Sequence, residues 1–222
     1  GITTVCDGIA DLLQRDYALT ERPRVVRSVP FYTKCSFNPC TEKIKILYHG
    51  MVDYSRRLEV LIRAIPLLDD KFIVEIRGPE NKIYLDGLKK IVSELGVENR
   101  VEFSPQVPFS EIISEANKAD IGYEVVDGFS PQHQFMLPNK FFENTMAGLA
   151  LCVSNFREMA RVIEKYHHGI CVETCSPEAV ATTLNSLSCE QINNMKKASL
   201  LAAKDLCWEK EERNMLDAYH LI

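Results

Sequence analysis

Short apolar runs alternate with stretches of helical periodicity along most of this chain. In residues 58–65 the apolar side chains fall at i, i+3, i+4 and i+7, the spacing of one helix face. Residues 43–49 and 72–77 are short and mostly apolar, as in strands that are buried on both faces. This alternation predicts a doubly wound, Rossmann-like α/β fold, in which helices cover both faces of a parallel sheet. The predicted strands are 43–49, 72–77, 100–103, 119–125, 150–153 and 169–173, and the predicted helices are 58–65, 84–95, 109–117, 138–148, 157–165 and 177–222, the last with a break at Ser188 or Cys189.

The first 42 residues follow a different pattern. Residues 2–6 and 24–29 are predicted strands, residues 8–17 a helix, and residues 30–41 a loop with two prolines and two cysteines. A second loop is predicted at residues 126–137, which are polar and lack periodicity. We therefore expect a small N-terminal unit followed by a larger α/β unit.

Composition argues against several classes of partner. The formal net charge is −5 and no run of five basic residues occurs, so nucleic acid is not expected as the main partner. No apolar stretch reaches the roughly 18 residues of a membrane span, so no transmembrane segment is predicted. The N-terminus lacks a signal-peptide pattern. It begins with glycine rather than methionine, and we expect a processed or excised piece of a longer protein.

Cysteines and histidines give no pattern typical of a metal site. The eight cysteines are irregularly spaced without any C-x-x-C, which favours free thiols in a reducing, cytoplasmic setting. His167 and His168 are adjacent before a strand, where neighbouring side chains point to opposite faces, and no third ligand follows at a suitable spacing. No G-x-G-x-x-G follows any predicted strand, so a dinucleotide cofactor is not expected. We predict no metal and no cofactor.

The segment 137–155 carries the strongest chemical signal. A short helix opens at Pro138 and ends at Gly148, each suited to its helix end. The free N–H groups of its first turn, together with Lys140, form a site for an anion. One turn later, Glu143 can accept two hydrogen bonds from neighbouring hydroxyls such as those of a ribose. An anion site beside a diol acceptor predicts a nucleotide site.

This segment resembles the nucleotide-sugar site of GT-B glycosyltransferases, in particular the large retaining family four (group 1). Many members read roughly P-N-K-x-F-E-x-M-A-A-G-x-P-V-V, against P-N-K-F-F-E-N-T-M-A-G-L-A-L-C-V at residues 138–153. The predicted elements from about 43 to 187 follow the order of that family's donor-binding half, and Trp208-Glu209 resemble its closing helix. On this resemblance, Glu143 falls on the ribose-binding glutamate of the family.

A second candidate for phosphate binding follows the first large strand. The strand ends at Gly50, and a helix is predicted to begin near Ser55, a plausible N-cap. The spacing alone favours a loop that carries two solvated arginines. The family has a glycine here, followed five or six residues later by a basic residue that meets the donor diphosphate. Arg56 matches that position best, and Arg57 less well.

The sequence departs from the family at one position. Members commonly show Glu-x7-Glu, but Phe135 stands eight residues before Glu143, and this puts the identity of the sugar in doubt. Polar candidates for contacts with the sugar or the phosphate are His133, Gln134 and Asn139. Gly78-Pro79 and residues 101–107 are candidates to line the base.

The resemblance implies a retaining transfer from a nucleoside-diphosphate sugar to a glycan or lipid-linked acceptor, in cell-surface polysaccharide or glycoconjugate synthesis. Arg56 and Lys140 would stabilise the charge on the leaving phosphate. Residues 1–42 would then be a remnant of the N-terminal acceptor domain plus a linker, and 43–205 the nucleotide-sugar-binding domain. Residues 206–222 would be a helix that packs back towards the N-terminal domain. The full-length enzyme would work in the cytoplasm, at the inner face of the membrane where the acceptor is lipid-linked.

Two other interpretations stay open from the sequence. One is a GT-B epimerase acting on a nucleotide sugar, although such enzymes use acid/base residues from both halves and no dedicated pair stands out here. The other is a non-catalytic flavodoxin-like or receiver-like binding module. A receiver needs an acidic cluster at the end of its first strand, whereas residues 48–50 are Tyr-His-Gly.

We predict that this chain by itself binds a nucleoside diphosphate but transfers little sugar, because the acceptor would be held by residues that precede it. A transfer assay with a nucleotide sugar and candidate acceptors tests this expectation. A robust turnover number from the chain alone would contradict it.

Overall fold

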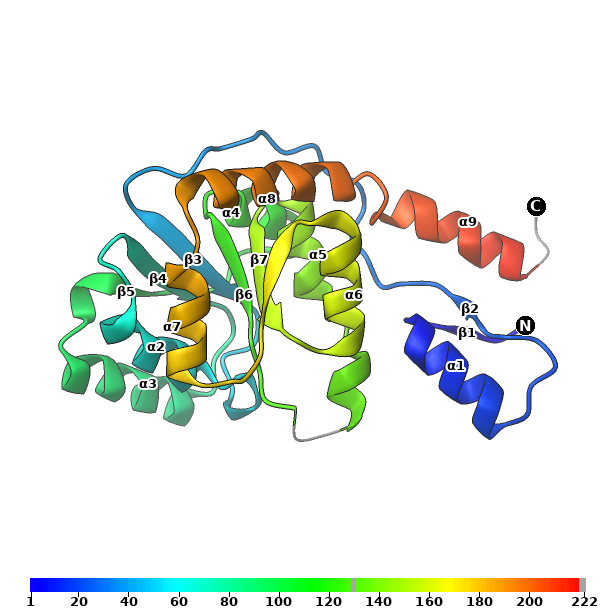
Figure 1. Ribbon diagram of the computed structural model, residues 1–222, viewed down its shortest axis with the longest axis horizontal. Helices are drawn as coiled ribbons and strands as arrows, with labels where there is room; N and C mark the ends of the chain where they lie inside the picture. The colour runs from blue at the N-terminus through cyan, green and yellow to red at the C-terminus, as the bar shows by residue number, and fades with distance from the viewer. Residues whose placement is uncertain (129–130, 220–222) are drawn as a thin grey trace.

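The computed structural model of the protein describes residues 1–128 and 131–219. A six-stranded parallel sheet forms its centre, with the strand order β5-β4-β3-β6-β7-β8 (Figure 1). The order runs outward in both directions from the β3–β6 pair, which confirms the predicted doubly wound fold. The strands are β3 (Ile44–His49), β4 (Phe72–Arg77), β5 (Val101–Ser104), β6 (Ile121–Glu124), β7 (Ala150–Ser154) and β8 (Gly169–Val172).

Alternate residues of each strand face different helical layers. In β7, Ala150 and Cys152 join a buried cluster with α2, α3 and α7. Leu151 and Val153 join a second cluster with α5, α6 and α8, so the strand is buried on both faces. The helices are α2 (Leu58–Ala64), α3 (Lys82–Leu95), α4 (Ile112–Ala116), α5 (Asn139–Met146), α6 (Arg157–Tyr166), α7 (Pro177–Asn185) and α8 (Cys189–Ala202), with short 3₁₀ helices η1 (Tyr54–Arg56), η2 (Ile65–Leu67), η3 (Glu98–Arg100), η4 (Phe109–Glu111) and η5 (Pro131–Phe135).

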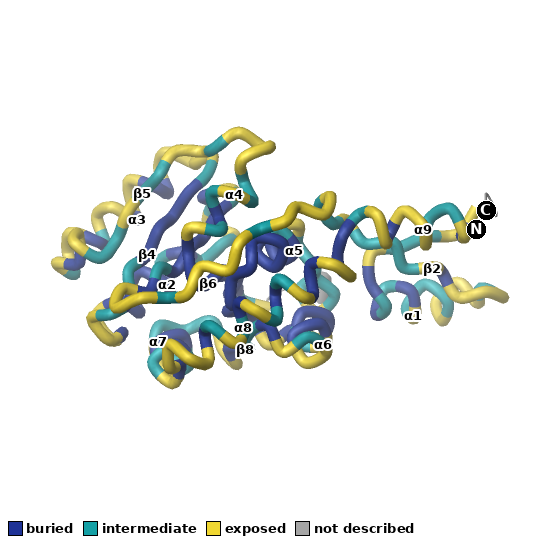
Figure 2. The backbone as a smooth tube through the Cα atoms, turned by 90° about the horizontal axis from the view of Figure 1, so that it is seen from above, coloured by how far each residue is buried: buried dark blue, intermediate teal, exposed yellow. Residues whose placement is uncertain are grey.

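The two ends of the chain pack together at one side of this sheet (Figure 2). Glu211, only 1% exposed, accepts a hydrogen bond from the Arg27 backbone N–H at 3.0 Å and pairs with the Arg27 guanidinium at 2.9 Å. The two N-terminal strands are shorter than predicted, and they pair only with each other among the described residues. This lobe contains β1 (Thr3–Thr4), α1 (Asp7–Asp16), β2 (Arg24–Val25) and α9 (Trp208–Ala218).

Capping residues account for some of the helix ends. Ser188 and Gln191 form a capping box at the start of α8, which confirms the predicted break there. Beyond the end of α5, Gly148 (φ 75°) and the following residue donate to the carbonyls of Thr145 and Asn144, a Schellman motif. The prediction that Ser55 caps a helix is wrong. Asp53 caps η1 instead by accepting from the Ser55 N–H, because Asp53 is the residue with extended backbone just before the turn, whereas Ser55 lies inside it.

Two further findings concern the chain as a whole. No helix within residues 1–128 and 131–219 is long and apolar enough to cross a membrane. All eight cysteines are free thiols. The loop predicted at 126–137 contains η5 (Pro131–Phe135), while residues 129–130 of that prediction lie outside the described part of the chain.

His168 is a buried polar residue without a hydrogen bond. Its ring is fully buried between the ring edges of Phe141 and Tyr166, with centroid distances of 5.7 and 5.9 Å. Neither ring nitrogen has a partner among the described residues. Burial disfavours the charged form and lowers the pKa of His168 to about 4.

We predict that His168→Phe makes the free energy of unfolding depend less steeply on pH below about 6.5. The folded pKa lies below the unfolded value of about 6.5, so the unfolded state binds more protons between these values. The contribution of His168 to the free energy of unfolding is therefore fully present above pH about 6.5. As the pH falls towards 4, the free energy of unfolding decreases by about 3 kcal/mol because of this one group. Denaturant unfolding at a series of pH values measures the difference.

His167→Asn provides the control, because His167 is exposed and its left-handed backbone (φ 53°) tolerates asparagine. The control should keep the wild-type pH dependence, including the part due to His49. If the free energy of unfolding of His168→Phe and of the wild type depended on pH in the same way, the lowered pKa of His168 would be contradicted.

Candidate functional site

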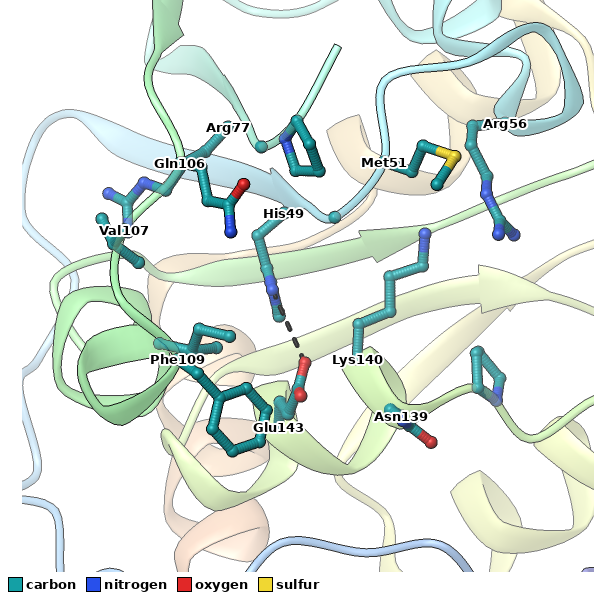
Figure 3. A pocket seen from close by; sticks show the side chains of 15 residues that line it. His49, Met51, Arg56, Arg77, Gln106, Val107, Phe109, Asn139, Lys140 and Glu143 are labelled. Atoms are coloured by element: carbon teal, nitrogen blue, oxygen red, sulfur yellow. Dashed lines mark ion pairs between the residues drawn. The ribbon is translucent and has the colours of Figure 1, made fainter.

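A pocket opens at the carboxyl ends of β3 and β4, beside the point where the strand order reverses. This is the expected position for a ligand in a doubly wound sheet. The pocket has a volume of about 390 Å³, and the first turn of α5 forms one of its walls (Figure 3). Of the predicted site residues, Gly50, Arg56, Asn139, Lys140 and Glu143 all line it.

The loops after β3 and β4 are bonded to each other along the pocket floor. The Gly50 N–H donates to the Arg77 carbonyl at 3.0 Å, and the Val52 N–H donates to the Pro79 carbonyl at 2.8 Å. Gly78 (φ 145°) lies so close to this loop that a Cβ there would sit 2.0 Å from the Gly50 carbonyl oxygen. No other residue type fits at this position.

Lys140 places a positive charge at one end of the pocket. Its ammonium lies 2.8 Å from the Glu124 carboxylate at the end of β6 and 4.2 Å from the centre of the Tyr48 ring. Both charged residues are buried, Lys140 at 8% and Glu124 at 2% exposure. Burial lowers the pKa of Lys140, and Glu124 opposes that shift. The ammonium also lies next to the backbone of Gly50, because a Cβ built there would be 3.9 Å from Lys140 Nζ.

Arg56 adds a second cation to the same end. It lies in η1, and its guanidinium points towards Lys140 across the pocket (Figure 3). The next residue, Arg57, takes a left-handed backbone (φ 52°) and pairs with Glu59 at 3.1 Å and Asp127 at 3.3 Å. The structure therefore places Arg56 in the pocket wall and turns Arg57 away.

Glu143 and His49 lie in the middle of the pocket. Glu143 is one helical turn beyond Lys140 and faces the same side. One of its oxygens lies 3.6 Å from His49 Nδ1, and His49 Nε2 lies 3.0 Å from Asn144 Oδ1. Burial is the largest influence on both, raising the pKa of Glu143 and lowering that of His49 to about 4.

The other end of the pocket has little charge. Arg77 lines it, but its guanidinium pairs with the buried carboxylate of Glu75. Gln106, Val107 and the 84% exposed Phe109 complete this end. A flat, partly apolar ring with polar edges fits such a surface better than an anion does.

Two predicted residues lie outside the pocket wall. His133 and Gln134 are in η5, where the His133 ring stacks on Phe156 at a centroid distance of 6.0 Å. Phe135, at the position of the missing glutamate, packs against α1, because a Cβ at Gly8 would meet its ring at 2.3 Å. A contact of His133 or Gln134 with the sugar remains a prediction.

Two residues that build the site were not predicted from the sequence. His49 and Glu124 are each the last residue of a strand, whereas Gln106 follows the end of β5 and lies in the segment 101–107 that was expected to line the base. A polar residue at the carboxyl end of an apolar parallel strand is the signal that could have identified the first two. As for metals, no group of histidine, cysteine or acidic residues that could hold an ion occurs in the part of the chain that the structure describes.

The sequence matches one known family over most of its length. Residues 36–199 match the family described as Glycosyl transferases group 1. The match covers more than half of the 222 residues, and the chain belongs to this family. The resemblance seen in residues 137–155 is thus confirmed. None of the curated proteins matches the chain significantly.

Solved structures of GT-B glycosyltransferases share the fold. A mutant of S. aureus TarM in complex with fondaparinux, alpha-GlcNAc-glycerol and UDP is 12% identical, with a TM-score of 0.76, and the match covers 99% of this chain and 43% of TarM. WaaG, a glycosyltransferase involved in lipopolysaccharide biosynthesis, is 15% identical with a TM-score of 0.71, over 97% of this chain and 62% of WaaG.

The pneumococcal O-GlcNAc transferase GtfA in complex with UDP and GlcNAc is 16% identical with a TM-score of 0.70, over 98% of this chain and 44% of GtfA. The chain therefore spans about half the length of these proteins. At these identities the likeness shows the fold, and the ligands belong to those proteins.

We predict that Glu124→Gln destabilises the protein by about 3 kcal/mol, because it leaves the buried Lys140 charge without its partner. The double variant Glu124→Gln/Lys140→Met should recover most of that loss, since it removes both charges at similar volume. Urea unfolding measures the three free energies. A double variant no more stable than Glu124→Gln alone would contradict the pairing.

A surface pair serves as the control. Lys118 and Glu115 lie 2.6 Å apart, but the lysine side chain is 65% exposed. Glu115→Gln should therefore cost less than about 1 kcal/mol.

Proposed function

We propose that this chain is the donor-binding half of a retaining glycosyltransferase, which binds a nucleoside-diphosphate sugar. The observation that carries the proposal is the order of groups along one pocket. Gln106 and Val107 lie at one end, Glu143 in the middle, and Arg56 and Lys140 at the other end. This order matches a base, a ribose and a diphosphate in turn, and membership of Glycosyl transferases group 1 supports it.

The cationic end suits the charge that develops in the reaction. Breaking the bond between sugar and phosphate leaves negative charge on the terminal phosphate, and groups aimed at that charge lower the barrier. Lys140 and Arg56 would supply two cations. In the first turn of α5, the N–H groups of Asn139 and Lys140 have no intrahelical acceptor and point in the same direction, whereas the Phe141 N–H donates to the Pro138 carbonyl. With these groups the transfer would need no metal and no other cofactor.

We propose UDP as the nucleotide part of the donor. The TarM and GtfA structures contain UDP, and both share the fold of this chain. The acceptor would be a glycan or a lipid-linked glycan held by a further domain, in polysaccharide or glycoconjugate synthesis in the cytoplasm or at the inner face of the membrane. WaaG, which has a role in lipopolysaccharide biosynthesis, is a precedent on the same fold.

Calorimetric titration with UDP, GDP, ADP and NAD tests the proposal. We expect selective, micromolar binding of UDP, because a diphosphate fits the cationic end and a single base fits the opposite end. Binding of none of the four, by a chain with a cooperative unfolding transition, would contradict the proposal. Epimerisation of the donor sugar without any acceptor would favour the nucleotide-sugar epimerase instead.

We predict that Arg56→Ala and Glu143→Ala each weaken the binding of nucleoside diphosphate by about 1–3 kcal/mol, the loss of one charge-assisted hydrogen bond. Calorimetry on the folded variants measures the change. Arg57→Gly is the matched control, because it removes the same charge one residue away at a backbone angle that suits glycine. If Arg56→Ala and Arg57→Gly weakened nucleotide binding equally, a specific contact of Arg56 with the diphosphate would be contradicted.

A further inference from the structure

His49 has two ring nitrogens that face different partners. Nε2 lies 3.0 Å from Asn144 Oδ1, and Nδ1 lies 3.6 Å from Glu143 Oε2. An amide oxygen can only accept a hydrogen bond, so Nε2 carries the proton. In a neutral imidazole the other nitrogen is then an acceptor. His49 therefore presents an acceptor, Nδ1, towards the pocket.

The surroundings keep this imidazole neutral at pH 7. Its side chain is almost fully buried, and the cations of Lys140 on α5 and Arg77 on β4 lie near it. Burial and these two charges lower the pKa of His49 to about 4, even though the Asn144 contact acts in the opposite direction. The Glu143 carboxylate is the acidic group that faces the ring.

Asn144 is itself held in place. A Cβ at Gly122 would lie 2.5 Å from Asn144 Cγ, so the amide rests directly on the backbone of β6. Asn144 is also 1% exposed, which leaves little room for it to move. The orientation of the His49 ring thus follows from the packing of α5 on the sheet.

Two acceptors, His49 Nδ1 and Glu143 Oε2, consequently face the same small space. Lone pairs 3.6 Å apart repel each other unless a hydrogen-bond donor lies between or beside them. A vicinal diol brings two O–H donors at the spacing of neighbouring carbons. Such a ligand gives each acceptor its own hydrogen bond.

We propose that His49 is a second acceptor for the ribose of the bound nucleotide: one ribose hydroxyl donates to Glu143 and the other to His49 Nδ1. The inference rests on the proposed function. The ribose is the relevant diol because this pair of acceptors lies between the end lined by Gln106 and the cationic end at Lys140 (Figure 3). The pocket then selects ribonucleotides against deoxyribonucleotides through both residues.

Competition between UDP, 2′-deoxy-UDP and 3′-deoxy-UDP tests the proposal. In the wild type, each missing hydroxyl should weaken binding by about fivefold to tenfold, the value of one hydrogen bond. In His49→Gln, the penalty for one of the two hydroxyls should disappear, while in Glu143→Ala, which has no side-chain acceptor, the penalty for the other should disappear. Glutamine keeps a donor near the position of Nε2 for Asn144 but has no acceptor at the position of Nδ1.

His49→Asn is the matched control, because its amide lies near the position of Nδ1 and restores an acceptor towards the ribose. It should keep both penalties, even if UDP binds more weakly overall. Circular dichroism and thermal unfolding establish that each variant is folded. If His49→Gln does not fold, the wild type and His49→Asn, compared with Glu143→Ala, still decide whether a second hydroxyl is recognised apart from Glu143.

Each outcome has one meaning. If the wild type does not bind UDP, the proposed function fails. If UDP binds and Glu143→Ala removes one penalty, but both penalties persist in His49→Gln, the role of His49 is overturned. A His49 effect seen only with a UDP-sugar and not with UDP would assign the contact to the donor sugar, and would also overturn it.

Discussion

The site depends on one buried charge, the ammonium of Lys140. A lysine at 8% exposure needs a counter-charge, and the Glu124 carboxylate at 2.8 Å supplies it from the end of β6. The Tyr48 ring at 4.2 Å supplies a second, weaker attraction from β3. Together they hold the first turn of α5 across the ends of two central strands. Glu143, one turn later, then faces His49, and Asn144 reaches the far side of the same ring.

Close packing of backbone sets the other wall. The loops after β3 and β4 are joined by hydrogen bonds, and Gly78 brings one loop onto the carbonyl of Gly50. Neither Gly50 nor Gly78 carries a side chain, so in the function we propose a phosphate could approach the backbone there. The hydrogen-bonded loops and the fixed position of α5 provide a preorganised site, as recognition of a charged ligand requires. The same contacts that stabilise the fold, the Lys140–Glu124 pair and the packing of Gly78 on Gly50, thus also shape the proposed binding site.

The sequence predicted the sheet, its order of elements and the site helix, because their signals are local. Apolar runs identify strands, Pro138 and Gly148 bracket a helix, and a motif places Glu143. Contacts between distant residues were not predictable in the same way. Lys196, in the helical segment after Ser188, is only 2% exposed and bonds to Asp120 at 2.6 Å, 76 residues away. The pairing of Lys140 with Glu124 and the orientation of His49 likewise follow from tertiary packing.

The most direct test of the account is a crystal structure of this chain with UDP. The account predicts uracil beside Gln106 and Val107, both ribose hydroxyls between Glu143 and His49, and the diphosphate at Gly50 and Lys140. A nucleotide bound outside this pocket, or bound in the opposite direction with its base at Lys140, would contradict it.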